Sequence, residues 1–163
     1  MQILEGDAGA GAGMRFAIVV ARYNDFVTER LLTGAIEALH AAGVPDADIT
    51  VLRVPGSFEL PLAARRAAET GRFDAVICLG CLIRGETPHF DYIASSVAHE
   101  LAASAGATGI PMAFGVLTTN SAEEALARAQ PGPSNKGREA AAAAVEMASL
   151  LARLDRPARG ASV

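Results

Sequence analysis

The sequence contains no tryptophan, only two tyrosines and just two cysteines among its 163 residues. Two cysteines are too few for the disulfide framework that stabilises small secreted proteins. No apolar run approaches the roughly 20 residues that a membrane-spanning helix needs. The first residues also lack the basic-then-apolar pattern of a secretory signal. These absences predict a cytoplasmic protein with no membrane partner.

Clustered positive charge is also missing. The net charge is −4 at pH 7, and no long block of lysine or arginine occurs. Nucleic-acid backbones are bound through such blocks, so nucleic acid is not an expected partner. The composition is not that of a disordered chain, because 51% of the residues are hydrophobic and 20% are charged. This length suits one domain with a substantial core.

Apolar segments of strand length alternate along the chain with segments of helical periodicity. Such alternation is typical of α/β proteins, in which right-handed crossovers build a parallel sheet with helices on both faces. We therefore predict a three-layer α/β/α sandwich around a flavodoxin-like, four-stranded parallel sheet. The strands are expected at residues 15–21, 49–54, 75–79 and 111–117, and the helices at about 25–43, 58–70, 89–106, 122–129 and 135–154.

This pattern fills one predicted domain, residues 14–154, between a short leading segment (1–13) and a tail (155–163). Within the leading segment, residues 2–5 form a very short predicted strand, and residues 6–13 are rich in glycine and alanine. A glycine-rich nucleotide loop follows a strand, whereas this tract precedes one, so we interpret it as a flexible tether. The tail is polar and is also expected to be flexible.

Polar residues interrupt the pattern after each predicted strand, at residues 22–25, 55–59, 80–89 and 118–121. The carboxyl ends of parallel strands meet at one edge of a sheet, where ligands bind in such folds. The four breaks are therefore expected to lie together although they are far apart in sequence. Asn24 or Asp25 is a candidate N-cap for the helix after the first break.

The break at residues 80–89 is the most informative one. The preceding strand is expected to stop at Gly80, and a polar turn at residues 84–88 leads into a helix that begins at about His89. The first N–H groups of a helix have no intrahelical partner, and the helix dipole favours negative charge there. It also favours a neutral imidazole, which can accept a proton. We predict that this turn holds a phosphate and that His89 moves protons beside it.

Roles without any catalytic function remain open for His89 and for the other candidate residues. His89 can be a solvated residue at a helix start, and Arg128 can simply complement the dipole at a helix C-terminus. Glu59 can supply surface charge in the first turn of its helix. Three aromatic residues border apolar segments and are compatible with ordinary core positions: Tyr23, Phe58 and Phe114.

Cys78 and Cys81 have the spacing of thiol-redox motifs. In those motifs the first cysteine lies at a helix N-terminus, which stabilises its thiolate. Here Cys78 lies inside a predicted strand, well before the next helix, so a redox role is disfavoured. A structural zinc ion would need four ligands, and the sequence does not pair these cysteines with others. No metal is therefore expected.

Five motifs, in order, resemble those of the lumazine synthases: ARYNDF (21–26), VPGSFELP (54–61), GCLIRGETPHFDYI (80–93), IPMAFGVLTT (110–119) and NKGREAA (135–141). The resemblance spans residues 14–154. It implies a reaction of riboflavin biosynthesis, in which 5-amino-6-(D-ribitylamino)uracil condenses with 3,4-dihydroxy-2-butanone 4-phosphate. The products are 6,7-dimethyl-8-ribityllumazine, phosphate and water, and the family uses no metal or organic cofactor.

Carried over position by position, the resemblance implies a role for each matched residue. His89 matches the proton donor and acceptor. Glu86 and Thr87 match residues that bind the butanone phosphate through main-chain N–H groups, and Arg128 matches a cation that clamps the phosphate. The positions that match binding of the ribitylaminouracil are Tyr23, Ser57, Phe58, Glu59, Cys81, Leu82, Ile83 and Phe114. Supporting positions are Asn24, Lys136 and Glu139.

The sequence departs from the family pattern at a few of these positions. Tyr23 stands where phenylalanine or tryptophan is frequent, which adds a hydroxyl to a ring that stacks similarly. Cys81 replaces a more common threonine, alanine or valine, a small change if only its backbone binds. The loop at residues 130–134 lacks a lysine that some relatives carry, so phosphate binding is expected to depend more on Arg128.

An assembly is also implied by the resemblance. Family members form pentamers in which Phe114 and Arg128 would be supplied by the neighbouring subunit, and some close twelve pentamers into a 60-mer shell. The short segment from residue 128 to 135 is typical of the shell-forming members. The strand at residues 2–5 would add to the neighbour's sheet and cover an exposed edge. Riboflavin synthase is an expected partner. Two other functions stay open, a shell that binds flavin-like ligands without turnover and a thiol-redox domain.

Overall fold

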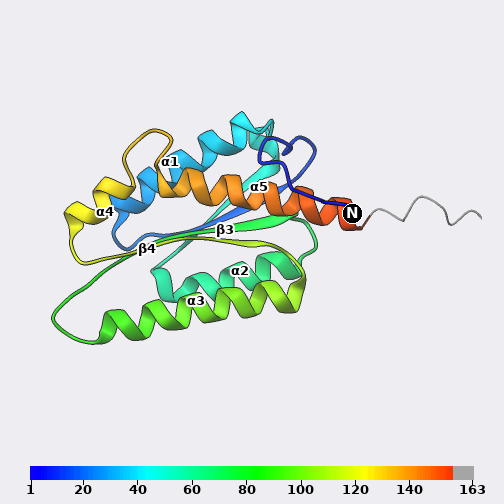
Figure 1. Ribbon diagram of the computed structural model, residues 1–163. Helices are drawn as coiled ribbons and strands as arrows, with labels where there is room; N and C mark the ends of the chain where they lie inside the picture. Colours follow the sequence, from blue (N-terminus) through cyan, green and yellow to red (C-terminus); the bar gives the residue numbers. More distant parts are fainter. Residues whose placement is uncertain (156–163) are drawn as a thin grey trace, which may run out of the picture.

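Four parallel strands form a single sheet in the computed structural model, which describes residues 1–155 (Figure 1). The strand order is β2-β1-β3-β4, and every neighbouring pair is parallel. The strands are β1 (Phe16–Ala21), β2 (Ile49–Val54), β3 (Ala75–Ile83) and β4 (Met112–Thr119). This confirms the predicted α/β fold with a flavodoxin-like parallel sheet. The predicted flexible tail lies outside the described residues, apart from its first residue.

Helices cover both faces of the sheet (Figure 1). One face carries α1 (Asp25–Ala41), α4 (Ala122–Arg128) and α5 (Lys136–Leu154), and the other carries α2 (Leu60–Glu69) and α3 (His89–Thr108). Two short 3-10 turns, η1 (Asp46–Asp48) and η2 (Ser57–Glu59), flank β2. The three-layer arrangement is therefore the one expected from the alternating pattern.

The apolar run of β1 is continuous because both of its faces are covered. Ile18 and Val20 pack into the core on the α1 and α5 side, whereas Ala17 and Val19 pack into the core on the α2 and α3 side. Side chains alternate between the two faces of a strand, so a strand between two helical layers needs apolar residues at every position. All six residues of β1 are fully buried.

The predicted end of β3 at Gly80 is wrong, because the strand continues through this glycine to Ile83. Gly80 pairs with Val116 of β4. A Cβ atom added at Gly80 would lie 2.6 Å from the Oγ of Ser57. The glycine therefore marks a close approach of η2 to the sheet and not a break in the strand.

Other predicted boundaries shift by a few residues. The helix expected at residues 58–70 is divided into η2 and α2. The helix expected to end near Gly106 continues to Thr108, and Gly109 ends it with a left-handed φ of 70°. Strand β4 extends two residues beyond its predicted end, to Thr119. These shifts leave the element order unchanged.

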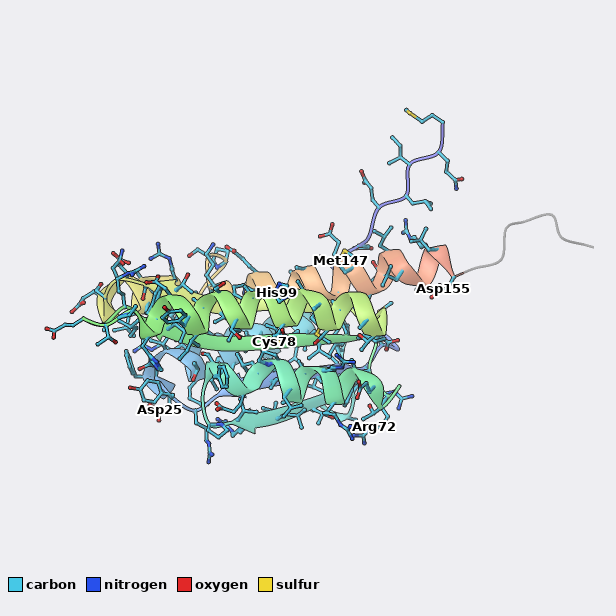
Figure 2. The ribbon with its side chains drawn as sticks, turned by 90° about the horizontal axis from the view of Figure 1, so that it is seen from below. Asp25, Arg72, Cys78, His99, Met147 and Asp155 are labelled. Carbon is cyan, nitrogen blue, oxygen red and sulfur yellow. The ribbon has the colours of Figure 1, made fainter. Side chains whose placement is uncertain are left out.

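The glycine- and alanine-rich tract is docked on the domain, so its interpretation as a flexible tether is wrong. The N–H of Asp7 donates to the Oγ of Ser149 in α5 at 2.7 Å. The N–H of Gly11 donates to the carbonyl of Ala42 at 3.0 Å. Residues 1–5 are instead exposed and run away from the body of the molecule (Figure 2). Their addition to a neighbour's sheet stays a prediction.

Small residues bring α1 and α5 into backbone contact. A Cβ atom added at Gly137 would lie only 2.0 Å from the carbonyl oxygen of Leu31. The buried face of α5 is otherwise built mainly from alanines: Ala140, Ala141, Ala144 and Ala148. The abundance of small residues in the sequence therefore serves close helix packing against α1 and the sheet.

Replacing Gly137 by alanine should lower the stability of the protein by about 1–3 kcal/mol or more, because the added methyl group overlaps a backbone oxygen that cannot rotate away. Thermal unfolding at fixed protein concentration measures the effect. Gly106→Ala is the matched control, because Gly106 lies on α3 with no atom within 4 Å of its added Cβ. The control should be neutral or stabilising, since alanine favours a helix over glycine by about 1 kcal/mol. Equal unfolding temperatures for the two variants would contradict the close packing.

Candidate active site in two halves

A hollow of about 910 Å³ opens at the carboxyl ends of β1, β2 and β3. The loop into α3 and the start of α1 lie at this end of the sheet, on the left in Figure 1. The hollow contains most of the residues singled out from the sequence: Tyr23, Asn24, Ser57, Phe58, Glu59, Leu82, Ile83, Thr87 and His89. We call it the first hollow. The predicted meeting of sequence breaks at one edge of the sheet is therefore observed. Three of the four breaks line this hollow, and the fourth, at residues 118–121, accepts hydrogen bonds from Arg84.

His89 is the first residue of α3 and is exposed to solvent. Three further residues of α3 line the first hollow, namely Tyr92, Ile93 and Ser96. They follow His89 by three, four and seven positions, the spacing that brings residues onto one face of a helix. Sequence reasoning missed these residues although this spacing signals them. Phe90 also lines the hollow and was missed.

Two aromatic rings stand uncovered in the first hollow. Tyr23 is 72% exposed and Phe58 is 60% exposed. Large apolar rings are normally buried when they serve the core. The plain core interpretation of these two residues is therefore wrong. Exposed flat rings on the wall of a hollow are suited to stacking on a planar ligand.

Asn24 is the N-cap residue of α1, as predicted, but its side chain makes no capping hydrogen bond to the helix. Its Nδ2 instead donates to the carbonyl oxygen of Cys81 at 2.9 Å. Asn24 has a φ of 63°, a left-handed conformation that asparagine tolerates better than most residues. The neighbouring N–H of Tyr23 donates to the carbonyl of Pro55 at 3.0 Å. These contacts join the ends of β1, β2 and β3 next to Tyr23.

Ser57 and Glu59 come from η2, the turn that follows β2. Ser57 is 5% exposed, and its Oγ occupies the space left by Gly80. Glu59 is exposed, so its carboxylate can accept hydrogen bonds from a bound ligand. Both residues line the first hollow, Ser57 with a nearly buried hydroxyl and Glu59 with an exposed carboxylate.

Arg84 ties the polar turn at residues 84–88 to its surroundings. Its guanidinium binds both carboxylate oxygens of Asp91, at 3.2 and 3.1 Å. Its Nε donates to the side chain of Asn120 at 3.2 Å, and its Cζ lies 4.4 Å from the ring centre of Phe90. A bidentate pair fixes orientation as well as distance. Arg84 thus secures the start of α3, where His89 lies, against the end of β4.

The remaining predicted residues of this region are placed differently. Thr87 lines the first hollow, whereas Glu86 is exposed and is not among its lining residues. Cys81 is 1% exposed and packs its thiol into the core on the α1 and α5 side. Cys81 does not line the first hollow, and its carbonyl oxygen accepts from Asn24.

The other four predicted residues gather in a second hollow of about 400 Å³. This second hollow lies between β4, the start of α5 and the end of α4, and it contains Phe114, Arg128, Lys136 and Glu139. Phe114 is 48% exposed. The Nζ of Lys136 lies 2.7 Å from a carboxylate oxygen of Glu139. The two cations of this hollow, one of them neutralised by Glu139, can bind an anionic group.

The two hollows share no lining residue. The first is walled mainly by η2 and α3, and the second by the edge strand β4, α5 and the end of α4. The predicted site residues therefore do not meet in one cavity of a single chain. This division was not predicted from sequence spacing, although the resemblance assigned Phe114 and Arg128 to a neighbouring subunit.

Cys78 and Cys81 are buried and free, and Cys78 lies in the sheet beneath α3 (Figure 2). Burial raises the pKa of Cys78 to about 12 and that of Cys81 to about 11. At pH 8 both thiols are protonated, and a protonated thiol is a poor nucleophile. This environment supports the sequence argument against a redox role.

Neither thiol should react with a disulfide reagent in the folded protein at pH 8. The expected result is negligible colour release from the native protein and two equivalents per chain after denaturation. Cys78→Ser should reduce stability, because it buries a hydroxyl, and should leave turnover nearly unchanged. Rapid labelling of the folded protein, or loss of turnover in folded Cys78→Ser, would contradict this account.

Within residues 1–155, no three histidine, cysteine, aspartate or glutamate side chains gather closely enough to hold a metal ion. In the same part of the chain, no helix combines the length and apolar character that crossing a membrane requires. The side chains that line the two hollows include exposed aromatic rings, the carboxylate of Glu59, the imidazole of His89, the guanidinium of Arg128 and the Lys136–Glu139 ion pair.

Fold and site together define an α/β protein whose hollows are suited to a small planar and anionic ligand. A family profile described as 6,7-dimethyl-8-ribityllumazine synthase matches residues 13–152. A protein of Syntrophus aciditrophicus named 6,7-dimethyl-8-ribityllumazine synthase is 51% identical over 142 residues, which cover 87% of this chain and 92% of that protein. The chain belongs to the 6,7-dimethyl-8-ribityllumazine synthase family. The expected enzyme class and the place in riboflavin biosynthesis are thereby confirmed.

Proposed function

We propose that the first and second hollows are two halves of one active site, completed where two copies of the chain meet. In this site 5-amino-6-(D-ribitylamino)uracil condenses with 3,4-dihydroxy-2-butanone 4-phosphate to give 6,7-dimethyl-8-ribityllumazine. Family membership supports the reaction. The observation that carries the two-copy site is the separation of Phe114 and Arg128 from His89 within one chain.

The first hollow binds the pyrimidine in this proposal. Tyr23 stacks on the planar ring, and the backbone of Leu82 and Ile83 runs along the ring's edge. Glu59 accepts hydrogen bonds from the ribityl hydroxyls, since an ionised carboxylate is an acceptor only. The volume of about 910 Å³ accommodates the substrate together with its ribityl chain.

The phosphate end of the second substrate lies between the turn of one chain and Arg128 of the next. Gly85 and Thr87 line the first hollow, and the main-chain N–H groups of Glu86 and Thr87 are the proposed donors. The exposed guanidinium of Arg128 adds charge-assisted hydrogen bonds to the phosphate. Lys136 supports this charge from the same hollow. Both substrates are then held side by side, which lowers the entropic barrier to their condensation.

His89 moves protons during the condensation. The amine adds to the ketone carbonyl, which must gain a proton before water can leave, and the amine must lose one. His89 stands at the mouth of the first hollow, next to the turn that would hold the phosphate. The leaving phosphate is therefore close to a group that can donate to it.

His89→Ala should lower kcat by about tenfold, below the usual range for general acid–base catalysis, because water can reach this exposed position and replace part of the proton transfer. Product absorbance under saturation with both substrates measures kcat. His99→Ala is the matched control, since His99 is an exposed histidine farther along α3 and does not line the first hollow (Figure 2). A turnover number within twofold of the unsubstituted protein would remove His89 from the mechanism.

The assembly that completes the site is a closed ring in this proposal. The two hollows are different surfaces, so their contact is head-to-tail, and such contacts generate rings when the rotation closes. A pentamer is the ring that the family resemblance implies, with a 60-mer shell and riboflavin synthase as a partner in the cytoplasm. The exposed residues 2–5 are available to extend a neighbour's sheet.

Incubation of the purified protein with both substrates tests the reaction directly. The expected result is product absorbance that appears well above the spontaneous rate and depends on protein concentration. Native mass measurement of the same sample should give a multiple of five chains. Binding of a lumazine-like ligand without any turnover would overturn the enzymatic proposal and favour the alternative of a binding shell.

A further inference from the structure

The connection between α4 and α5 contains one fully buried amide, Asn135. It is 2% exposed and immediately precedes Lys136, which together with Arg128 supplies the cations of the second hollow. Buried polar side chains are rare unless they are well hydrogen-bonded. The side chain of Asn135 makes contacts with three separate segments of the chain.

The oxygen of this amide caps α5. Its Oδ1 accepts from the N–H of Gly137 at 2.9 Å and from the N–H of Arg138 at 3.1 Å. An N-cap side chain of this kind satisfies N–H groups that have no partner within the helix. The first turn of α5, which carries Lys136 and Glu139, is therefore fixed relative to Asn135.

The nitrogen of the same amide holds the end of α4. Its Nδ2 lies 3.0 Å from the carbonyl oxygen of Ala129 and 3.2 Å from that of Gln130, the two residues that follow Arg128. It also lies 3.2 Å from the carbonyl oxygen of Arg30 in α1. One amide therefore joins the residues after Arg128 to the start of α5 and to α1.

A glycine on α1 leaves room for this amide. A Cβ atom added at Gly34 would lie 2.3 Å from the Oδ1 of Asn135. The surrounding helix thus fits the side chain closely, and the amide has little freedom to move. The loop at residues 130–134 is otherwise made of residues with no such buried contact, since it is exposed or half-exposed throughout.

We infer that Asn135 is a positioning residue for the phosphate half of the active site, which it serves by holding Arg128 at a fixed place relative to Lys136. This inference rests on the proposed function, in which Arg128 binds the phosphate of the butanone substrate. Asn135 itself touches no substrate. Its effect on the reaction should therefore pass through Arg128 and be confined to the phosphorylated substrate.

The test is a double-mutant cycle between Asn135→Ser and Arg128→Ala. Serine can still cap α5, because it is as good an N-cap as asparagine, but it lacks the nitrogen that binds the carbonyls after Arg128. Asn135→Ser should raise KM for the butanone phosphate about tenfold and change KM for the pyrimidine by less than twofold. In the Arg128→Ala background the same substitution should add almost nothing, since residues that act through one group are not additive.

Ser121→Ala is the matched control. Ser121 caps the other end of α4 by accepting from the N–H of Glu124 at 3.1 Å. Ser121→Ala removes a side-chain N-cap, as a loss of Asn135 would, but leaves the contacts of Asn135 in place. The KM values for the butanone phosphate and for the pyrimidine should therefore stay unchanged. Gly34→Ala is a second probe, because it displaces the amide without removing it and should reproduce the rise in KM for the butanone phosphate.

Each possible result of these experiments supports or overturns the positioning role of Asn135. An equal rise in both KM values, or an effect that adds fully to that of Arg128→Ala, would make Asn135 a purely structural residue. If Asn135→Ser does not fold, Gly34→Ala gives the same comparison with all polar groups retained. If Arg128→Ala raises KM and the Asn135 and Gly34 variants do not, the inference fails and the proposed function stands. If Arg128→Ala itself leaves KM unchanged, the phosphate role of Arg128 fails, and this inference fails with it.

Discussion

Arg128→Ala should lower kcat/KM for the butanone phosphate by about a hundredfold. Hydrogen bonds to a charged partner contribute about 1.5–3 kcal/mol, which corresponds to roughly ten- to 150-fold. In the isolated chain the guanidinium has a contact to the carbonyl of Glu124 at 3.1 Å and is otherwise exposed at the rim of the second hollow. The side chain can therefore be removed with little cost to the fold, and the loss should appear in substrate use.

Steady-state kinetics with each substrate varied in turn checks this prediction. KM for the pyrimidine should change little, because Arg128 faces only the phosphate. The kcat/KM of Arg128→Lys for the butanone phosphate should lie between that of the unsubstituted protein and that of Arg128→Ala. Lysine keeps the charge but lacks the planar guanidinium that matches phosphate oxygens. Arg66→Ala is the control for removal of an exposed helical arginine outside both hollows. Equal kinetics for Arg128→Ala and Arg66→Ala would rule out a phosphate role for Arg128.

The fold was largely predictable because its signals are local. Strand β1 must be apolar at every position to lie between two helical layers, and its sequence shows this directly. The meeting of β1, β2 and β3 ends at the first hollow follows from parallel strand order, so distant residues such as Tyr23 and His89 could be placed together. Local pattern and topology together therefore fixed the first half of the candidate site.

The errors arose where a residue's role depends on a distant contact. Gly80 resembles a strand end in sequence, but it stays in β3 because Ser57 needs the space of its missing side chain. Asn24 resembles a helix cap, but its amide donates to Cys81, which is 57 residues away. Glycine and asparagine have several uses, and only the tertiary contact selects among them.

The division of the site between two hollows could not be predicted from the sequence pattern either. Arg128 ends α4, the helix that follows the carboxyl end of β4, so topology alone would place it near His89. However, α4 packs with α1 and α5 on the face opposite to α3. Phe114 pairs with Cys78 in the middle of the sheet, away from its carboxyl edge. That detail comes from packing and not from periodicity.

Mixing two inactive variants should restore activity if the site is shared between chains. One variant carries Glu59→Ala and His89→Ala in the first hollow, and the other carries Arg128→Ala in the second. Each alone should have about 1% of the unsubstituted activity, as two or three charge-assisted contacts are lost. In a head-to-tail ring assembled from equal amounts, about a quarter of the sites combine two intact halves, so activity should rise to about 25%.

Co-expression with two different tags, or joint refolding of both chains, allows the subunits to mix before assay. A second mixture combines the unsubstituted chain with a chain that carries all three substitutions. It distinguishes a shared site from a site within one chain. A shared site again leaves about a quarter of the sites intact, whereas a site within one chain leaves about half. A single-chain site also predicts no recovery in the first mixture. Activities of about 1% and 50% in the two mixtures would therefore refute the two-copy site, and about 25% in both would establish that His89 and Arg128 act from different chains.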